Sequence, residues 1–206
     1  MPTVNNMKAI RMMVLSILLT THVMAWGNFD EGLEAYHHGH YETALREWKP
    51  LAEQGDIESQ IRLGYLYFDG LGNKQDFKEG VKWFRMAADQ GSPEAQGKLG
   101  VAYQLGKGDL PKDYKEAANW YRKAAEQGAY NRYYNLGFLY ENGGNGLRQD
   151  YVQAYMWYSL EIPRYRDNFN DIHRIRIEEK MTPAQIAEGR QLAREWLEKH
   201  PYPTPE

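Results

Sequence analysis

The chain contains no cysteine among its 206 residues. Disulfide bonds, a cysteine nucleophile and thiolate metal sites are therefore excluded. An excess of positive charge is missing too, since 25 lysines and arginines stand against 28 aspartates and glutamates and give a formal net charge of −3. Because nucleic-acid binding needs a basic footprint on the protein, we expect no nucleic-acid partner.

Long apolar runs are also scarce, and the one near the N-terminus is short. Two basic residues precede an apolar run over residues 12–19, and residues 23–25 fit the small-residue rule for cleavage after Ala25. This order is typical of a secretory signal peptide, whereas a stable membrane span needs about 20 apolar residues. We therefore expect residues 1–25 to be removed and the mature protein to be periplasmic or secreted, with no stable membrane span. The alternatives are an uncleaved anchor and a buried first helix.

One pattern recurs three times along the chain, at intervals of 36 and then 37 residues. Each copy contains a glycine three residues before a tyrosine, then a glycine-rich loop, then an aspartate seven residues before a tryptophan. A fixed period in this range is the signature of a solenoid, which works mainly by presenting a surface rather than one reactive centre. The recurring residues are Gly64, Gly100 and Gly137; Tyr67, Tyr103 and Tyr140; Asp76, Asp113 and Asp150; and Trp83, Trp120 and Trp157.

Each copy predicts two antiparallel helices joined by the loop. In residues 56–91, Asp56 can cap a first helix whose apolar residues recur on one face. Asp76 can cap the second helix, and Gly91 can end it. Gly64 costs about 1 kcal/mol of helix propensity relative to alanine, so its recurrence in every copy indicates that a neighbouring helix crosses there at close range.

The full copies span residues 56–91, 92–128 and 129–165, and a shorter relative with the spacing of a tetratricopeptide repeat occupies residues 26–55. The motif A-x-x-x-L-G-x-x-Y-x-x-G, followed by D-x-x-x-A-x-x-W-Y-x-x-A-A-x-x-G, is clearest over residues 95–128. It resembles the Sel1-like repeat, a relative of the tetratricopeptide repeat with a longer loop between its two helices. The resemblance implies an all-α fold, a right-handed α-solenoid of antiparallel helix pairs.

The C-terminal segment is predicted to close the open end of the last repeat. The third copy lacks the alanine pair that ends the second helix in the other two, and terminal repeats are expected to be atypical. Residues 166–200 predict capping helices, in which Thr182 and Gln185 form a capping box and an apolar stripe extends to Trp196 and Leu197. We expect residues 201–206 to be a flexible tail.

Four further patterns could suggest a functional site but have simpler structural explanations. The histidines of residues 37–40 suggest a metal site, but they fall at a predicted turn and Gly39 breaks the ligand geometry, so we expect no metal and no cofactor. The recurring tryptophans could form a sugar-binding platform, yet their period favours core positions. The recurring aspartates lie one per repeat, which favours helix caps over a catalytic pair. The mixed charges of residues 164–179 indicate a solvated helix face.

The resemblance implies an adaptor that binds proteins and has no catalytic activity. We expect a monomer that takes a peptide or protein segment in the concave groove lined by the first helix of each pair. Tyr130 and Tyr133 are further candidates for contact with the partner. The outward positions counted from the repeat glycine, together with one of the bunched tyrosines, are Arg62, Tyr65, Lys98, Val101, Gln104, Tyr134, Asn135, Phe138 and Glu141.

Two other functions stay open at the level of the sequence. One is a cell-wall-active or hydrolytic protein, because some relatives with this repeat have been linked to β-lactam binding or hydrolysis. Those relatives are rich in cysteine and this chain has none, which argues against that function. The other is an immunity or regulatory partner of a toxin or secretion system, which the sequence does not separate from an adaptor.

Overall fold

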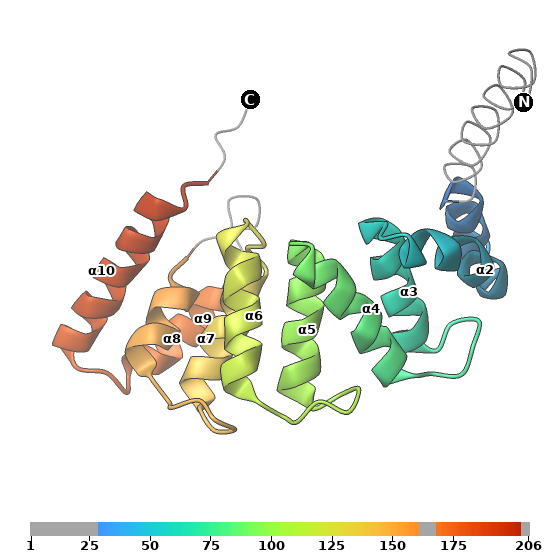
Figure 1. Ribbon diagram of the computed structural model, residues 1–206. Helices are drawn as coiled ribbons and strands as arrows, with labels where there is room; N and C mark the ends of the chain where they lie inside the picture. The colour runs from blue at the N-terminus through green and yellow to red at the C-terminus, as the bar shows by residue number, and fades with distance from the viewer. Residues whose placement is uncertain (1–28, 161–167, 203–206) are drawn as a thin grey trace, which may run out of the picture. The chain divides into compact units, whose positions relative to one another are not determined.

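The computed structural model describes residues 29–160 and 168–202 (Figure 1). The predicted signal peptide over residues 1–25 and the end of the third copy, residues 161–165, lie outside the described residues. Within the described ranges the chain is all-α and forms no strand. Nor does any helix in this part of the chain combine the length and the apolar character needed to cross a membrane.

The chain divides into two compact units, Met1–Asp76 and Phe77–Glu206. In the second unit, successive helices from α4 to α8 run alternately up and down as antiparallel pairs (Figure 1). The helices of the first unit are one over residues 29–37, α2 (Tyr41–Glu53) and α3 (Ile57–Asp69). Those of the second unit are α4 (Phe77–Asp89), α5 (Pro93–Leu105), α6 (Tyr114–Glu126), α7 (Arg132–Asn142), α8 (Tyr151–Tyr158), α9 (Asn168–Glu178) and α10 (Pro183–Lys199).

Short polar side chains begin several of these helices. Asp56, Asp113 and Asp150 each accept a hydrogen bond from the backbone N–H three residues later, and Ser92 does the same at the start of α5. These bonds satisfy one of the backbone donors that a helix start leaves unpaired. The capping role predicted for Asp56, Asp113 and Asp150 is therefore confirmed, and that of Asp76 stays a prediction.

The repeat glycines of the second unit lie where an aromatic side chain of the partner helix packs against the backbone. A Cβ atom placed on Gly100 of α5 would lie 2.5 Å from two ring atoms of Tyr121 on α6. Gly137 of α7 stands in the same relation to the ring of Tyr158 on α8. The predicted close crossing is thus confirmed at Gly100 and Gly137, where the ring of a tyrosine fills the space that a side chain would need, and at Gly64 it stays a prediction.

The tryptophans of the three copies, Trp83, Trp120 and Trp157, are buried, as their period predicts. In the first unit Trp48 is also fully buried, and its Nε1–H donates to the carbonyl oxygen of Phe29 at 3.1 Å. Gly32 lies directly against the Trp48 indole. These contacts fix the helix over residues 29–37 onto α2.

Helix α10 caps the last repeat by packing on α8, as predicted. Thr182 and Gln185 form the reciprocal capping box at its start. Trp196 lies edge-on to Trp157, with ring centroids 4.7 Å apart, and its Nε1–H donates to the hydroxyl of Tyr133 at 3.3 Å. The fold therefore ends with an aromatic cluster that α10 closes.

The end of the chain differs from the flexible tail expected from residue 201. Tyr202 packs edge-on against Tyr130, with ring centroids 5.2 Å apart, and lies on the same hydrophobic cluster as α10. The ordered contacts therefore extend at least to Tyr202.

Candidate functional site

The exposed side of the first helices in the second unit is the candidate functional site. On α5 it includes Lys98, Val101 and Leu105, and on α7 it includes Asn135 and Phe138. Leu105 is 54% exposed, and the other four are partly exposed. Apolar residues occur all round α5 and α7, whereas α4 and α6 confine theirs to one face. We call this surface the first-helix face.

Behind the first-helix face, in the pairs α5–α6 and α7–α8, a tyrosine from the second helix donates a hydrogen bond to a side chain of the first helix. Tyr121 donates to Gln104 Oε1 at 2.7 Å, and Tyr158 donates to Glu141 Oε2 at 3.0 Å. The two pairs occupy equivalent positions of the second and third repeats. Burial raises the pKa of both Tyr121 and Tyr158 above the ordinary value of a phenol, so both hydroxyls keep their protons and donate.

Glu141 does not face outward, so that prediction is wrong. Only 7% of its side chain is exposed, because α9 lies over it. Arg176 of α9 donates from Nη2 to both carboxylate oxygens, at 2.6 and 2.8 Å. The Nδ1 atom of His173 lies 3.8 Å from Glu141 Oε2 and 2.9 Å from the same nitrogen of Arg176.

The geometry around His173 favours its neutral form. Its ring packs against Tyr134 and Tyr158, with both centroid distances 5.2 Å. Burial and then the charge of Arg176 lower the pKa of His173 below its ordinary value. A neutral imidazole can accept a hydrogen bond from Arg176 through Nδ1, so His173 helps to orient the guanidinium toward Glu141.

The bunched tyrosines at the start of α7 separate into different environments. Tyr133 is fully buried in the cluster closed by α10, so the suggestion that it contacts a partner is wrong. Tyr130 is partly buried between Tyr133 and Tyr202. Tyr134 is partly exposed and packs on Phe138 as well as on His173. Only Tyr134 therefore adjoins the first-helix face.

The two remaining site predictions, Arg62 and Tyr65, belong to the first unit. Arg62 is partly exposed and pairs with Glu58 of the same helix at 2.7 Å. Tyr65 is partly buried on α3. Their role in binding a partner stays a prediction.

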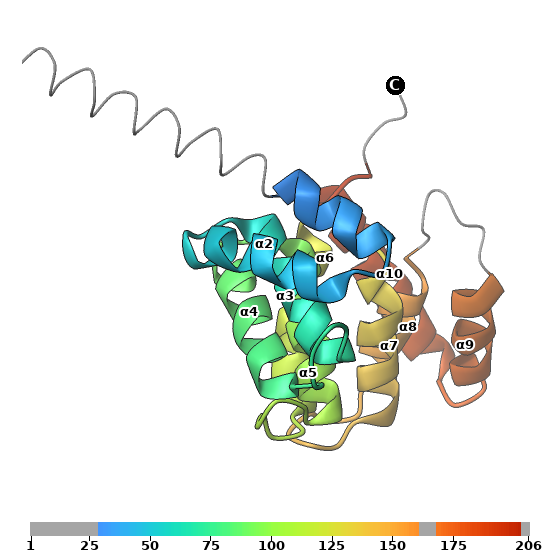
Figure 2. The ribbon, with the colours of Figure 1, turned by 90° about the vertical axis from the view of Figure 1, so that its right-hand side faces the viewer.

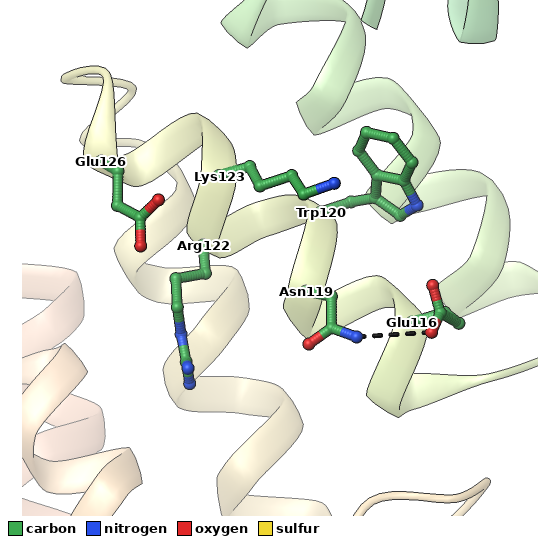
Figure 3. Close-up of a pocket in the computed structure, with 6 residues that line it drawn as sticks. All are labelled: Glu116, Asn119, Trp120, Arg122, Lys123 and Glu126. Atoms are coloured by element: carbon green, nitrogen blue, oxygen red, sulfur yellow. Dashed lines mark hydrogen bonds between the residues drawn. The ribbon is translucent and has the colours of Figure 1, made fainter. Parts of the chain in front are cut away.

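A shallow depression of about 300 Å³ lies on the outer side of α6 (Figure 3). In it the side chain of Lys123 extends toward the Trp120 ring, with Nζ 4.1 Å from the ring centroid. Arg122 leaves the other side of the helix and donates to the Tyr140 hydroxyl at 2.7 Å. All the lining residues come from this one helix and their charges balance. They are Glu116, Asn119, Trp120, Arg122, Lys123 and Glu126.

Two arginines at equivalent positions of the second unit make the same structural contact. Arg85 donates to the hydroxyl of Tyr103 at 2.9 Å, and Arg122 stands in the same relation to Tyr140. Each bond joins the second helix of one repeat to the first helix of the next. These arginines therefore set the spacing of repeats rather than offer a free binding site.

The histidines near residue 38 are the other candidate for chemistry. His38 and His40 stack with ring centroids 6.3 Å apart, and His38 Nδ1 lies 2.9 Å from the carbonyl oxygen of Glu34. Within residues 29–160 and 168–202, no group of three or more histidine, aspartate or glutamate side chains is placed to hold a metal ion.

Comparison with known proteins agrees with this architecture. The family model of the Sel1 repeat matches residues 57–92, 93–128 and 133–160. Among solved structures, the protein is similar to c5321, a protective antigen present in uropathogenic Escherichia coli strains that displays an SLR fold, with 36% identity and a TM-score of 0.73. That match covers 85% of this chain and 38% of the antigen.

A second solved structure is the Sel1 repeat protein from Oxalobacter formigenes, with 36% identity and a TM-score of 0.55. The match covers 64% of this chain and 51% of that protein, so the chain spans about half or less of both relatives. The repeat glycines, the aspartate caps and the antiparallel helix pairs all correspond to the matched segments. The chain is a Sel1 repeat protein.

Proposed function

We propose that the protein is a non-catalytic, monomeric adaptor that binds a peptide or protein segment on the first-helix face. The observation that carries the proposal is the partial exposure of Val101, Leu105 and Phe138 on the same side of α5 and α7. Exposed apolar side chains that cluster with polar neighbours mark interaction surfaces more often than catalytic sites. Repeat proteins of this architecture commonly present such surfaces.

Acidic substitutions on this face should strongly reduce partner binding. The double variant Val101→Glu/Phe138→Glu places two charges where a partner must exclude water, and an unpaired charge is costly to bury. We expect pull-downs from an envelope extract to recover at least about ten-fold less partner than the native protein does, since central apolar contacts dominate binding energy.

The control is Met86→Glu, which introduces one such charge at an apolar residue of α4 that is 37% exposed. Capture should be unchanged, and all three proteins should melt within a few degrees of one another. Equal capture by the double variant and the native protein would show that the partner binds elsewhere.

We also propose that the protein is exported, with its signal peptide cleaved after Ala25. Support comes from the basic and apolar order of the first residues, and from the similarity to a protective antigen. N-terminal sequencing of protein from the envelope fraction should begin at Trp26. Recovery of a chain starting at Met1 or Met7 from the cytosol would contradict export.

A further inference from the structure

Glu141 carries a charge where the preceding repeat has a neutral side chain. The equivalent residue, Gln104, accepts from Tyr121 and completes that contact without charge. In the third repeat, Tyr158 makes the same bond to Glu141, but the nearly buried carboxylate then needs a cation. A buried charge is tolerated only when it is paired and hydrogen-bonded. The Glu141 carboxylate therefore forms a binding site for a cation, and Arg176 supplies that cation.

Helix α9, which supplies that cation, is held on the repeats by few side chains, among them His173 and Ile177. Of its described side chains, residues 170–178, only Ile177 is buried, while Ile172 and Ile175 are 60% and 54% exposed. The Arg176 side chain is 50% exposed beyond its contact with Glu141. Figure 2 shows α9 as a separate short helix beside α7 and α8. An isolated helix of 11 residues is marginal in water, so α9 depends on this docking.

This cation site at Glu141 adjoins the first-helix face. Tyr134 and Glu141 lie on α7, and the Tyr134 ring is 6.4 Å from that of Phe138, centroid to centroid. Aromatic rings beside a carboxylate are the setting in which arginine binds best, because its planar guanidinium both stacks and donates several hydrogen bonds. A segment bound along α7 could therefore continue from Phe138 onto this carboxylate.

We propose that Glu141, Tyr158 and Tyr134 form a binding site for an arginine of a partner's helical segment, which Arg176 of α9 fills in the free chain. The proposal rests on the proposed adaptor function and specifies its ligand. The partner chemistry is an amphipathic helix with an arginine followed by an aliphatic residue, as in Arg176-Ile177. Such a helix replaces α9 and inherits its contacts.

The test uses the full chain and, as the probe, a fluorescein-labelled synthetic peptide of residues 168–180. Fluorescence anisotropy should show that the Arg176→Ala protein binds this peptide at least about ten-fold tighter than the native protein, because no internal arginine competes. A peptide carrying Arg176→Gln should bind the same variant about ten-fold more weakly, the usual scale for losing a charged hydrogen bond. The matched control peptide carries Ile175→Gln, since Ile175 is 54% exposed on the docked helix, and it should retain most of the affinity.

The Arg176→Ala protein could misfold because it leaves the Glu141 carboxylate without its cation. A second variant therefore serves as a control for this effect. The variant Glu141→Gln/Arg176→Ala recreates the Gln104–Tyr121 arrangement of the preceding repeat and should melt near the native temperature. It should bind the native and Arg176→Gln peptides equally. A preserved preference for arginine in this variant, or no preference in Arg176→Ala, would overturn the proposal. Partner capture that still depends on Val101 and Phe138 would then show that the adaptor function stands without the arginine site.

Discussion

Gly100→Leu should unfold or badly loosen the second repeat and lower the melting temperature by about 2–12 °C, as overpacking of about 1–3 kcal/mol implies for a domain of this size. The reason is the Tyr121 ring, which would lie 2.5 Å from the first added carbon atom. Tyr121 is itself fully buried and bonded to Gln104, so it has no space into which to move. Circular dichroism melts of the native and variant proteins would measure the effect.

Two further variants identify the cause of that loss. Lys98→Leu adds the same side chain to a partly exposed position of α5 and should change the melting temperature by about 1–2 °C at most, as surface substitutions usually do. Tyr121→Ala combined with Gly100→Leu should be more stable than the sum of the two single effects, because the smaller residue makes room for leucine. Additive losses of stability would show that the Tyr121 ring is not the group with which the leucine added at position 100 clashes.

The parts of the fold that repeat were predictable, because each one follows from local chemistry copied three times. The cap at Asp113 needs only a short acceptor before an apolar helix, and the structure has that bond at 2.9 Å. The crossing at Gly100 follows from a glycine that recurs despite its cost in helix propensity. The capping box of α10 is likewise contained in four consecutive residues.

The candidate site was less predictable, because its decisive contact joins residues far apart in the sequence. Arg176 pairs with Glu141 across 35 positions, and neither residue carries a local signal of the other. The mixed charges around Arg176 predicted a solvated helix face, which holds for Asp171 and for half of the Arg176 side chain, but did not predict the bond from Arg176 to Glu141. Counting from the repeat glycine placed both Gln104 and Glu141 outward, which holds for the partly exposed Gln104 but not for Glu141. The one available signal was the change from glutamine to glutamate at equivalent positions, since a new charge needs a new partner.

Tyr133 illustrates the same limit at the other side of α7. Its neighbours Tyr130 and Tyr134 are partly exposed, and nothing in the sequence distinguishes the three. Tyr133 is buried because Trp196, 63 positions later, donates to its hydroxyl. A helix that docks from outside the repeat pattern therefore decides which tyrosines remain available to a partner.

Deleting residues 182–206 should give an aggregation-prone protein with a lower melting temperature. The deletion removes the whole of α10 and exposes Tyr133 and Trp157, which the helix now covers. Fully burying a large apolar side chain contributes about 1.5–3 kcal/mol, so the partly buried Trp196 and Leu197 together contribute on the order of 2–4 kcal/mol. A solenoid also needs its terminal unit covered to stay soluble. Size-exclusion chromatography with light scattering would detect association, and calorimetry would give the melting temperature.

Two control proteins separate loss of the cap from loss of chain length. A chain ending at Tyr202 keeps the contacts of α10 and that of Tyr202 with Tyr130, so it should behave as the native protein. The full chain with Trp196→Ala loses only the indole that contacts Tyr133 and Trp157, and its melting temperature should fall part of the way toward that of the truncated protein. A truncated protein that stays monomeric and melts with the native one would contradict the capping role. In that case the aromatic cluster would be stable in water without α10, and the helix would be free to bind a partner itself.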